Sequence, residues 1–398
     1  MKNLLLASVA SLAASAALAE QHMEGPVKIG VELGFTGPLE SLAPQMASGA
    51  EMAMSEISES GLLLGGMTVE PVRADSTCID AAAATSAMER LVTDDGVAAV
   101  VGADCSGVTG AMLSNVAVPN GIVMISPSAT SPGLTDAEDN GLFFRTAPSD
   151  ARQGEIVTDI LRENGVESIA ITYTNNDYGK GLADSIEANF ADAGGTVTIS
   201  ASHEDGKADY SSEVAALASA GGDVLVVAGY VDQGGSGVVR AALDSGAFDT
   251  FYFPDGMISQ ALTDNFGDEI DGSYGANPGT DSEGAGIYQG KATDAGYDGT
   301  SPFSAEAYDA AALILLAMQA AGSTDPSVFK DSVMDVANAP GEQILPGDLE
   351  TALQILADGG DIDYVGASAV ELIGPGESAG NYREVTFEGG ELSVVGYR

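Results

Sequence analysis

Hydrophobic and polar residues along the first third of the chain follow two alternating periodicities. Short runs rich in apolar and β-branched residues predict strands, and stretches with apolar residues three and four positions apart predict helices. The predicted strands are 27–33, 67–74, 97–101 and 122–125, and the helices between them are 44–59, 80–93 and 107–118. Strands and helices in alternation are typical of a parallel sheet covered by helices.

A second series of the same kind begins after Arg145. Its strands are predicted at 168–173, 197–201 and 223–229, and its helices at 156–162, 181–193 and 210–220. Two such series predict an α/β protein made of two doubly wound lobes.

The last third of the chain departs from this alternation. Three helical patterns, at 304–321, 326–337 and 346–357, follow one another with hardly a strand between them. They form a separate appendage or return to cover the first sheet, and the pattern leaves both arrangements open. Two alternating segments at 382–387 and 392–397 flank Glu-Gly-Gly-Glu, which predicts a hairpin that completes the second sheet.

Length and charge narrow the choice of protein class. A chain of 398 residues with 45% hydrophobic residues is long enough for two cores. Its formal charge is −45, from 59 acidic and 14 basic residues, and the acids are spread along the sequence. Such a charge repels phosphate backbones and anionic lipids, so we expect no nucleic-acid or membrane-surface partner.

The N-terminus has the features of a secretory signal peptide. Lys2 precedes an apolar stretch from Leu4 to Leu18, and Ala-Leu-Ala at 17–19 is a small-x-small cleavage site. We expect cleavage after Ala19, which makes 1–19 the signal peptide and places the mature chain in the periplasm. No later stretch is long and apolar enough to span a membrane.

The chain has two cysteines, Cys78 and Cys105. In an oxidising compartment two cysteines favour one disulfide, which would close a loop of about 28 residues and stabilise the fold by about 3–4 kcal/mol. The alternative is a reactive thiol, which needs a nearby base. His22 lies near the mature N-terminus and His203 far along the chain, so the sequence favours the disulfide.

The sequence lacks several motifs of common catalytic chemistry. The patterns H-E-x-x-H, C-x-x-C and G-x-x-x-x-G-K-[ST] do not occur. Glycines at 229–237 follow a predicted strand, but their spacing does not fit the dinucleotide-binding pattern. We therefore expect a binding protein without catalysis, metal or cofactor.

Hydroxyl side chains follow two predicted strands of the first lobe. Ser106 comes after the strand at 97–101, and Thr130 comes after the strand at 122–125. Ligands of open α/β sheets bind beyond the carboxyl ends of the strands, where hydroxyls and free N–H groups can hold a carboxylate. The alternative for each residue is a simple helix cap.

Three residues occupy the corresponding positions in the second lobe, namely Tyr178, Tyr230 and Asp255. Asp255 is suited to accept hydrogen bonds from an ammonium group, and tyrosines are suited to cover an apolar stem. Taken alone, Asp255 is explained equally as a turn residue. The joint placement of these residues with the hydroxyls of the first lobe indicates a binding site for a small zwitterion.

These residues lie within motifs that resemble those of the leucine/isoleucine/valine-binding family of periplasmic solute receptors. The similarity runs from about residue 26 to the C-terminus, and the motifs are specific as a group. They are VKIGVELGFTGP at 27–38, Cys78, DCSG at 104–107, ISPSATSP at 125–132, NDYGKG at 176–181 and FPDG at 253–256.

The resemblance implies a type I periplasmic binding fold, in which three crossovers join the two lobes. It assigns 24–147 and 278–357 to lobe 1, and 148–277 and 358–398 to lobe 2. The late helices then belong to lobe 1 and the final hairpin to lobe 2. It also implies the bridge between Cys78 and Cys105.

The resemblance further implies a set of ligand contacts. The α-carboxylate contacts of the family fall on Ser106 and Thr130. Its α-ammonium contacts fall on the carbonyl of Ser128, on Thr130 and on Asp255. Tyr178, in lobe 2, matches a family tyrosine that reaches toward the ligand.

Two further aromatic positions match the family, and three positions depart from it. Tyr230 matches a second tyrosine from lobe 2, and Phe303 matches an aromatic residue at the side-chain pocket. The family usually has Glu at the position of Asp255 and, in the leucine-type receptors, an aromatic residue at the position of Leu42. Asp104 replaces an apolar residue, so it either makes local hydrogen bonds or contacts the ligand and favours a polar or cationic side chain.

By this resemblance the protein is a monomeric receptor that captures a branched-chain amino acid by hinge closure. It would deliver the amino acid to an inner-membrane ABC permease and would not catalyse a reaction. The family also contains receptors for amides, urea and aromatic acids, and the same fold serves as a ligand-sensing partner of membrane receptors. An aromatic acid needs no ammonium-binding acid, so Asp255 argues against that alternative.

Overall fold

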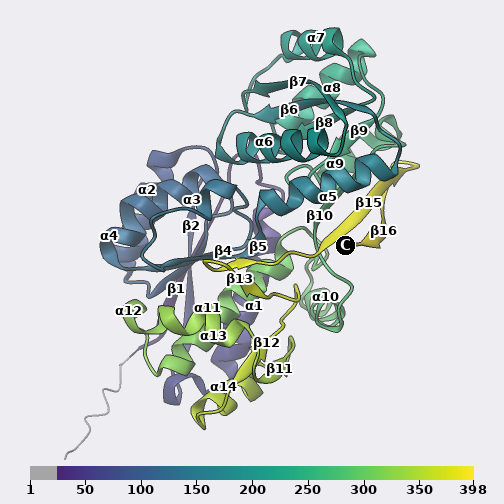
Figure 1. Cartoon of the computed structure of the whole chain (residues 1–398). Helices are drawn as coiled ribbons and strands as arrows, with labels where there is room; N and C mark the ends of the chain where they lie inside the picture. The colour runs from purple at the N-terminus through teal and green to yellow at the C-terminus, as the bar shows by residue number, and fades with distance from the viewer. Residues whose placement is uncertain (1–24) are drawn as a thin grey trace, which may run out of the picture.

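The structure is a computed structural model that describes residues 25–398, so the predicted signal peptide and its cleavage after Ala19 lie outside the described residues. Two seven-stranded sheets form the centres of two lobes (Figure 1). Between residues 25 and 398, no helix combines the length and hydropathy that a membrane span requires.

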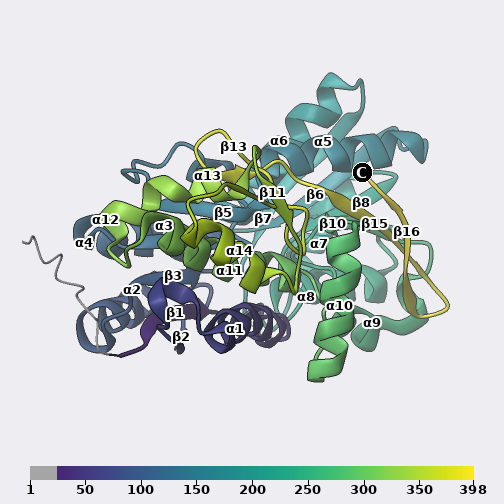
Figure 2. The same ribbon diagram turned by 90° about the horizontal axis from the view of Figure 1, so that it is seen from below.

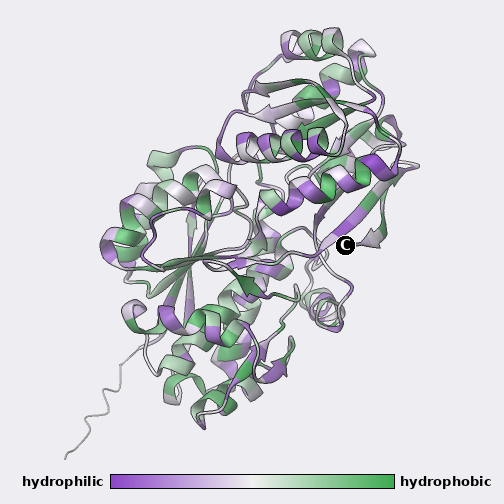
Figure 3. Ribbon diagram, viewed as in Figure 1, coloured by the Kyte–Doolittle hydropathy of each residue, from purple (hydrophilic) through white to green (hydrophobic). Residues whose placement is uncertain are grey.

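The first lobe is built on a sheet with strand order β13-β14-β5-β4-β3-β1-β2, in which only the β13–β14 pair is antiparallel. The strands are β1 (Val27–Leu33), β2 (Val69–Asp75), β3 (Ala99–Gly102), β4 (Val123–Ser126), β5 (Phe143–Pro148), β13 (Leu372–Ile373) and β14 (Glu377–Ser378). The central strands β3 and β4 are buried along their whole length, which explains why they appear in the sequence as uninterrupted apolar runs (Figure 3).

Helices cover both faces of this sheet (Figures 1 and 2). They are α1 (Ala43–Ser60), α2 (Ala81–Arg90), α3 (Ser106–Met112), α4 (Val118–Asn120), α11 (Ser304–Ala321), α12 (Pro326–Phe329), α13 (Val333–Ala337) and α14 (Leu349–Ala357). A small parallel pair, β11 (Glu342–Ile344) and β12 (Ile362–Tyr364), lies beside α14.

Helices α1 and α11 pack against each other on the sheet, where α1 contacts β1 and β2, and α11 contacts β3, β4 and β5. Every residue from 306 to 319 is buried, which accounts for the hydrophobic character of the helix on all sides. Gly49 of α1 allows the two helices to approach closely, because a Cβ atom there would lie 2.3 Å from the carbonyl oxygen of Ser304. The late helices therefore cover the first sheet, and the alternative of a separate appendage is wrong.

The second lobe has the strand order β16-β15-β10-β9-β8-β6-β7. Its strands are β6 (Ser168–Thr174), β7 (Thr196–His203), β8 (Val224–Ala228), β9 (Phe251–Phe253), β10 (Tyr274–Pro278), β15 (Tyr382–Glu388) and β16 (Glu391–Tyr397). Helices α5 and α6 contact each other on one face, and α7 and α8 contact each other on the opposite face (Figure 1). The hairpin β15–β16 extends the sheet from β10, as predicted.

Six helices accompany the strands between β5 and the C-terminal third: α5 (Asp150–Glu163), α6 (Asp177–Asp192), α7 (Ser211–Ala220), α8 (Gly234–Ser245), α9 (Gln260–Phe266) and α10 (Glu283–Ala295). In Figure 3, α5 alternates between hydrophilic and hydrophobic residues, as expected for a helix with one side toward the protein interior.

The chain passes between the two sheets three times, after β5, after β10 and after β14. These passages confirm the predicted fold of two lobes joined by three crossovers. One part of the predicted division needs correction, because residues 362–378, assigned to 358–398 of lobe 2, pair with strands of lobe 1. Strand β14 pairs with β5, so the chain leaves lobe 1 later than predicted. The other lobe boundaries stay a prediction.

Cys78 and Cys105 form a disulfide with a Cα–Cα distance of 5.1 Å. The bridge joins the loop after β2 to the residue that precedes α3. Residues 25–398 contain no free cysteine, so the disulfide is confirmed and the alternative of a reactive thiol is wrong.

Strand β1 carries a buried carboxylate, Glu32. The side chain has no solvent exposure, and neither carboxylate oxygen has a hydrogen-bond partner among residues 25–398. Burial, together with the nearby charge of Asp104, raises the pKa of Glu32 from 4.5 to about 8. In the unfolded chain Glu32 ionises near pH 4.5, so its effect on stability becomes less favourable as the pH rises from 4.5 to 8.

We expect Glu32→Gln to raise the melting temperature more at pH 8 than at pH 5. At pH 8 the substitution removes a desolvation cost on the order of 2 kcal/mol, whereas at pH 5 the native Glu32 is already neutral. Thermal unfolding of both proteins at the two pH values measures the difference. Glu70→Gln, an exposed change on the neighbouring strand, is the matched control. An equal effect of Glu32→Gln at both pH values would contradict the assignment.

Candidate functional site

The hydroxyl residues of lobe 1 lie on two adjacent loops at the carboxyl ends of β3 and β4. Ser106 is the first residue of α3, and its Oγ accepts a hydrogen bond from the N–H of Ser131 at 3.1 Å. Ser128 Oγ donates to the carbonyl oxygen of Asp104 at 3.0 Å. Thr130 is fully buried, and its hydroxyl has no hydrogen-bond partner within the described chain. The predicted lobe 1 residues are thus neighbours.

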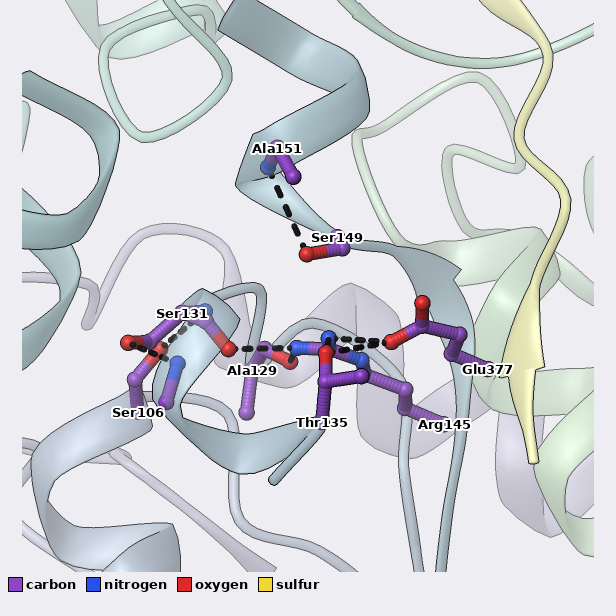
Figure 4. Close-up of polar contacts among 9 residues, drawn as sticks. Ser106, Ala129, Ser131, Thr135, Arg145, Ser149, Ala151 and Glu377 are labelled. Carbon is purple, nitrogen blue, oxygen red and sulfur yellow. Dashed lines mark hydrogen bonds and ion pairs between the residues drawn. The ribbon is translucent and has the colours of Figure 1, made fainter. Parts of the chain in front are cut away.

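A buried arginine holds the loop that carries Thr130 (Figure 4). Arg145 Nη1 donates to the carbonyl oxygens of Ala129 and Ser131, at 3.0 and 2.8 Å. Arg145 Nη2 donates to Thr135 Oγ1 at 2.7 Å and to Glu377 Oε2 at 2.5 Å. The planar guanidinium therefore fixes the backbone on both sides of Thr130, and the sequence analysis did not identify this role. The sign of this role in the sequence is a cationic residue within the largely apolar segment FFRTAP, which forms the buried strand β5.

The predicted residues of lobe 2 also form one group. Tyr178 OH donates to Asp255 Oδ1 at 2.6 Å, and the N–H of Gly256 donates to the same oxygen at 2.8 Å. The rings of Tyr178 and Tyr230 stack with their centroids 5.1 Å apart. Burial and the charge of Asp255 raise the pKa of Tyr178 well above its usual value, so Tyr178 remains a hydrogen-bond donor.

The two groups face each other across lobes that are in contact. The N–H of Asp232 in lobe 2 donates to the carbonyl oxygen of Pro38 in lobe 1 at 3.2 Å, and Asp232 Oδ2 accepts from the N–H of Ser41 at 2.8 Å. On another side, α6 contacts α3 and the short helix Pro132–Leu134. Every predicted site residue is at least 92% buried, so the structure is a closed conformation.

Asp150, the first residue of α5, lies where the two groups meet. Its backbone N–H donates to the carbonyl oxygen of Thr130 at 2.8 Å. Its side chain is fully buried, and burial together with the charge of Asp255 raises its pKa well above the usual value. The sequence does not single out this residue, because an acid in the first turn of a helix is explained by the helix dipole alone.

Two other predicted residues have different surroundings. The carboxylate of Asp104 accepts hydrogen bonds from Gly34 N, Ser76 Oγ and Cys105 N at 2.8, 3.1 and 3.0 Å. These contacts favour the alternative that Asp104 makes hydrogen bonds within its own lobe. A contact between Asp104 and a ligand stays a prediction. Phe303 is the residue immediately before α11, and it lies in the same extensive apolar core as Leu42 and the two stacked tyrosines.

The contact through Asp232 provides a test of lobe closure. We expect Asp232→Ala to weaken ligand binding by about 3- to 10-fold, because the closed form loses one hydrogen bond between the lobes. The ligand should dissociate faster, while the melting temperature of the ligand-free protein changes little. Stopped-flow dissociation measures the effect, and Glu187→Ala on the exposed face of α6 is the control. Equal dissociation rates for Asp232→Ala and the native protein would exclude a role of this contact in closure.

The arrangement is suited to bind a small molecule that carries both charges. Hydroxyl groups of lobe 1 face a carboxylate and two tyrosines of lobe 2, and all are removed from water. Buried charges require partners, so such a site favours a ligand with a carboxylate at one end and an ammonium group nearby. Among residues 25–398, no group of three or more His, Cys, Asp or Glu side chains is arranged to hold a metal ion.

Sequence comparison identifies similar proteins along most of the chain. A sequence profile described as "Periplasmic binding protein" matches residues 26–339. Leu/Ile/Val-binding protein homolog 1 of Brucella melitensis biotype 1 is 30% identical over 344 residues, which is 85% of this chain and 86% of the relative.

Solved structures share the fold. The branched-chain amino acid substrate-binding protein LivJ from Streptococcus pneumoniae, in complex with isoleucine, has a TM-score of 0.76 and 23% identity, and the match covers 93% of this chain and 99% of LivJ. A solute-binding protein from R. palustris in complex with benzoate has a TM-score of 0.74 and 19% identity, with coverage of 94% and 96%.

Proposed function

Because this chain belongs to the leucine/isoleucine/valine-binding family of periplasmic binding proteins, we propose that it captures a branched-chain amino acid between its lobes and delivers it to an ABC importer. The protein acts in the periplasm after cleavage behind Ala19, as a monomer, and its membrane partner is the permease of the importer.

This proposal rests on two groups of buried side chains in the closed conformation. One group consists of hydroxyls from lobe 1, and the other consists of an acid and two tyrosines from lobe 2. In our proposal the hydroxyls of Ser106 and Thr130 hold the α-carboxylate on lobe 1. The Ser128 carbonyl, Thr130 and Asp255 accept hydrogen bonds from the α-ammonium group. Tyr178, hydrogen-bonded to Asp255, then closes over the ligand from lobe 2.

The remaining contacts would select the side chain. In our proposal the buried side chains of Phe303 and Leu42 contact the ligand side chain, and such apolar surroundings favour a hydrophobic side chain over a charged one. The hydrogen bonds of Asp104 within lobe 1 support the same preference, because they leave this carboxylate engaged with its own loops. Tyr230 stacks on Tyr178 and completes the lobe 2 wall.

An aromatic acid is the second candidate, since a structural neighbour binds benzoate. A benzoate-like ligand has no cation, and Asp255 would then be buried beside an anion without compensation. Amides and a role as the ligand-sensing partner of a membrane receptor are further alternatives. The site residues favour an amino acid over an aromatic acid or an amide as the ligand.

Family members are solute-binding proteins, and we propose that this protein likewise has no catalytic activity. The pattern G-x-S-x-G does occur once, as GESAG at 376–380. Its serine, Ser378, lies on β14, and the chain continues into β15 rather than into a helix. The strand-turn-helix context that makes such a serine a nucleophile is therefore missing.

A thermal-shift panel on protein freed of co-purified ligand by unfolding and refolding tests the proposed function. Leucine, isoleucine and valine at about 100 times their dissociation constants should raise the melting temperature by about 3–6 °C. Benzoate and simple amides should have no effect. A shift with benzoate alone would overturn the proposal in favour of an aromatic acid receptor, and no shift with any amino acid would overturn it entirely.

A further inference from the structure

A second cavity lies between the lobes, beside α1, α9 and the hairpin β15–β16. Its volume is about 740 Å³. One wall is formed by residues 41–45 at the start of α1 and by the loop 298–302, which leads to α11. The opposite wall is formed by residues 258–264 and the hairpin. Of the residues assigned to the amino-acid site, only Leu42 lines this cavity, so the two sites are separate.

Arg383 of β15 is the cation of this cavity. Its Nε donates to Asn277 Oδ1 at 3.0 Å, on the neighbouring strand β10. The side chain lies against the crossover that follows β10, where a Cβ atom at Gly279 would be 3.1 Å from Arg383 Cδ. Neither Nη group has a hydrogen-bond or ion-pair partner within residues 25–398. The guanidinium is thus fixed through one nitrogen, and the other two are free to bind a ligand.

The neighbouring acids do not neutralise Arg383. Glu306 and Asp298 are nearby, but neither forms an ion pair with it in the described part of the chain. Asp298 Oδ1 instead accepts hydrogen bonds from the N–H and Oγ1 of Thr300, at 2.8 and 2.7 Å. Burial lowers the pKa of Arg383, because a cation removed from water is unfavourable without a counter-charge. Residues 25–398 do not supply that counter-charge.

The other lining residues indicate the shape of a ligand. Ser259 lines the same cavity, and its hydroxyl is buried without a hydrogen-bond partner within the described chain. Leu42, Ile258 and Leu392 give the cavity an apolar wall. An arginine and a hydroxyl beside an apolar wall suit a carboxylate that carries a short aliphatic chain.

Three exposed acids at the edge of the cavity limit the charge of the ligand. They are Asp264, Asp298 and Glu391. Solvent and salt screen these exposed charges more than the enclosed charge of Arg383, so a single negative charge is still attracted to the guanidinium. A phosphate or a dicarboxylate brings additional negative charge toward the acids. The cavity is therefore suited to a monoanion.

We propose that this cavity is a second ligand site, which binds a short-chain aliphatic monocarboxylate on Arg383 and couples its binding to lobe closure. A carboxylate can accept hydrogen bonds from both free nitrogens of the planar guanidinium. Because the walls come from both lobes, the complete site exists only in the closed conformation. Its ligand therefore stabilises that conformation and slows the release of an amino acid from the first site.

Release of radiolabelled L-leucine from loaded protein at pH 6 tests this coupling, and this readout rests on the proposed function. Bound leucine keeps the first site occupied, so the carboxylate cannot compete there. Burial raises the pKa of Glu306 to about 7, so this neighbour of Arg383 is mostly neutral at pH 6.

Sodium butyrate is the probe, with an expected dissociation constant on the order of 1–10 mM. At about 20 mM it should slow leucine release by about 3- to 20-fold. Butyramide with sodium chloride at the same ionic strength should have no effect, because it lacks the charge that Arg383 binds.

Variants assign the effect to Arg383. Arg383→Gln should abolish the effect of butyrate on leucine release, and Arg383→Lys, which keeps the charge without the planar group, should retain less than about half of it. Arg240→Gln, an exposed change outside the cavity, should respond like the native protein. If Arg383→Gln does not fold, Ser259→Ala replaces it as the test and should reduce the effect by about 2- to 5-fold.

Three results would overturn the second site. They are equal leucine release in butyrate and in sodium chloride, an equal effect of butyramide, and an unchanged effect of butyrate in Arg383→Gln. Each of them leaves the proposed function intact. If the native protein binds no amino acid, the proposed function fails, and melting temperatures then decide on the second site. Butyrate must raise the melting temperature of the native protein and leave that of Arg383→Gln unchanged.

Discussion

Replacing Asp255 by asparagine is expected to weaken L-leucine binding by about 100- to 1,000-fold. In our proposal Asp255 neutralises the ammonium group in a site that closure removes from water. Loss of its charge leaves a buried cation with a reduced counter-charge, which costs about 3–4 kcal/mol. Asparagine keeps an oxygen that can accept the hydrogen bond of Tyr178, so the local structure is retained.

Isothermal titration and thermal unfolding of ligand-free protein separate binding from folding in this variant. The melting temperature should remain equal to that of the native protein or increase, because burial raises the pKa of Asp255 and makes its ionised form unfavourable. Asp264→Asn, at an exposed position on α9, is the matched control. An unchanged dissociation constant for Asp255→Asn would remove Asp255 from the ligand site.

Replacing Arg145 by alanine should destabilise the protein by about 3–5 kcal/mol and also weaken binding. The substitution leaves the largely buried Glu377 carboxylate without its cation, since the side chains of Arg145 and Glu377 are only 1% and 16% exposed. It also releases the carbonyl oxygens on either side of Thr130, so the loop loses its fixed geometry.

Arg145→Lys distinguishes charge from geometry. Lysine keeps the charge, but a single ammonium group cannot replace the four hydrogen bonds of the planar guanidinium. We expect Arg145→Lys to lose about 1–3 kcal/mol in urea unfolding and to bind leucine less tightly than the native protein. Arg152→Lys, on the exposed side of α5, serves as the control. If Arg145→Lys has the same free energy of unfolding as the native protein, the hydrogen bonds of the guanidinium are not required for stability.

The elements that could be predicted from the sequence are those whose own pattern decides their structure. Strand β1 occupies the predicted range 27–33, and α11 occupies 304–321, because apolar residues predominate in each segment and its boundaries are clear. Strand β5 was missed, since Arg145 interrupts its apolar run and its ion-pair partner, Glu377, lies 232 positions away. Strands β13 and β14 have two residues each, which is too short for any periodicity.

The residues of the candidate site likewise fall into those that could be predicted from the sequence and those that could not. Ser106 and Thr130 follow predicted strands, so the topology of a parallel sheet was sufficient to bring them to one edge. Asp255 follows β9, which was not predicted, and it was identified from the FPDG segment. The roles of Arg145 and Asp150 depend on burial and on which groups lie nearby. Arg145 and Glu377 are 232 positions apart, and only the completed fold brings them together.

The late position of β14 in the sequence also affects the order in which this protein can fold. The first sheet is completed by β14, which enters near the C-terminal end and supplies Glu377 to Arg145. The N-terminal lobe therefore lacks its edge strand and the partner of its buried cation until almost the whole polypeptide has been synthesised. Completion of the first core is thereby postponed until the chain is nearly full length, and a protein truncated before β14 should lack a stable first lobe.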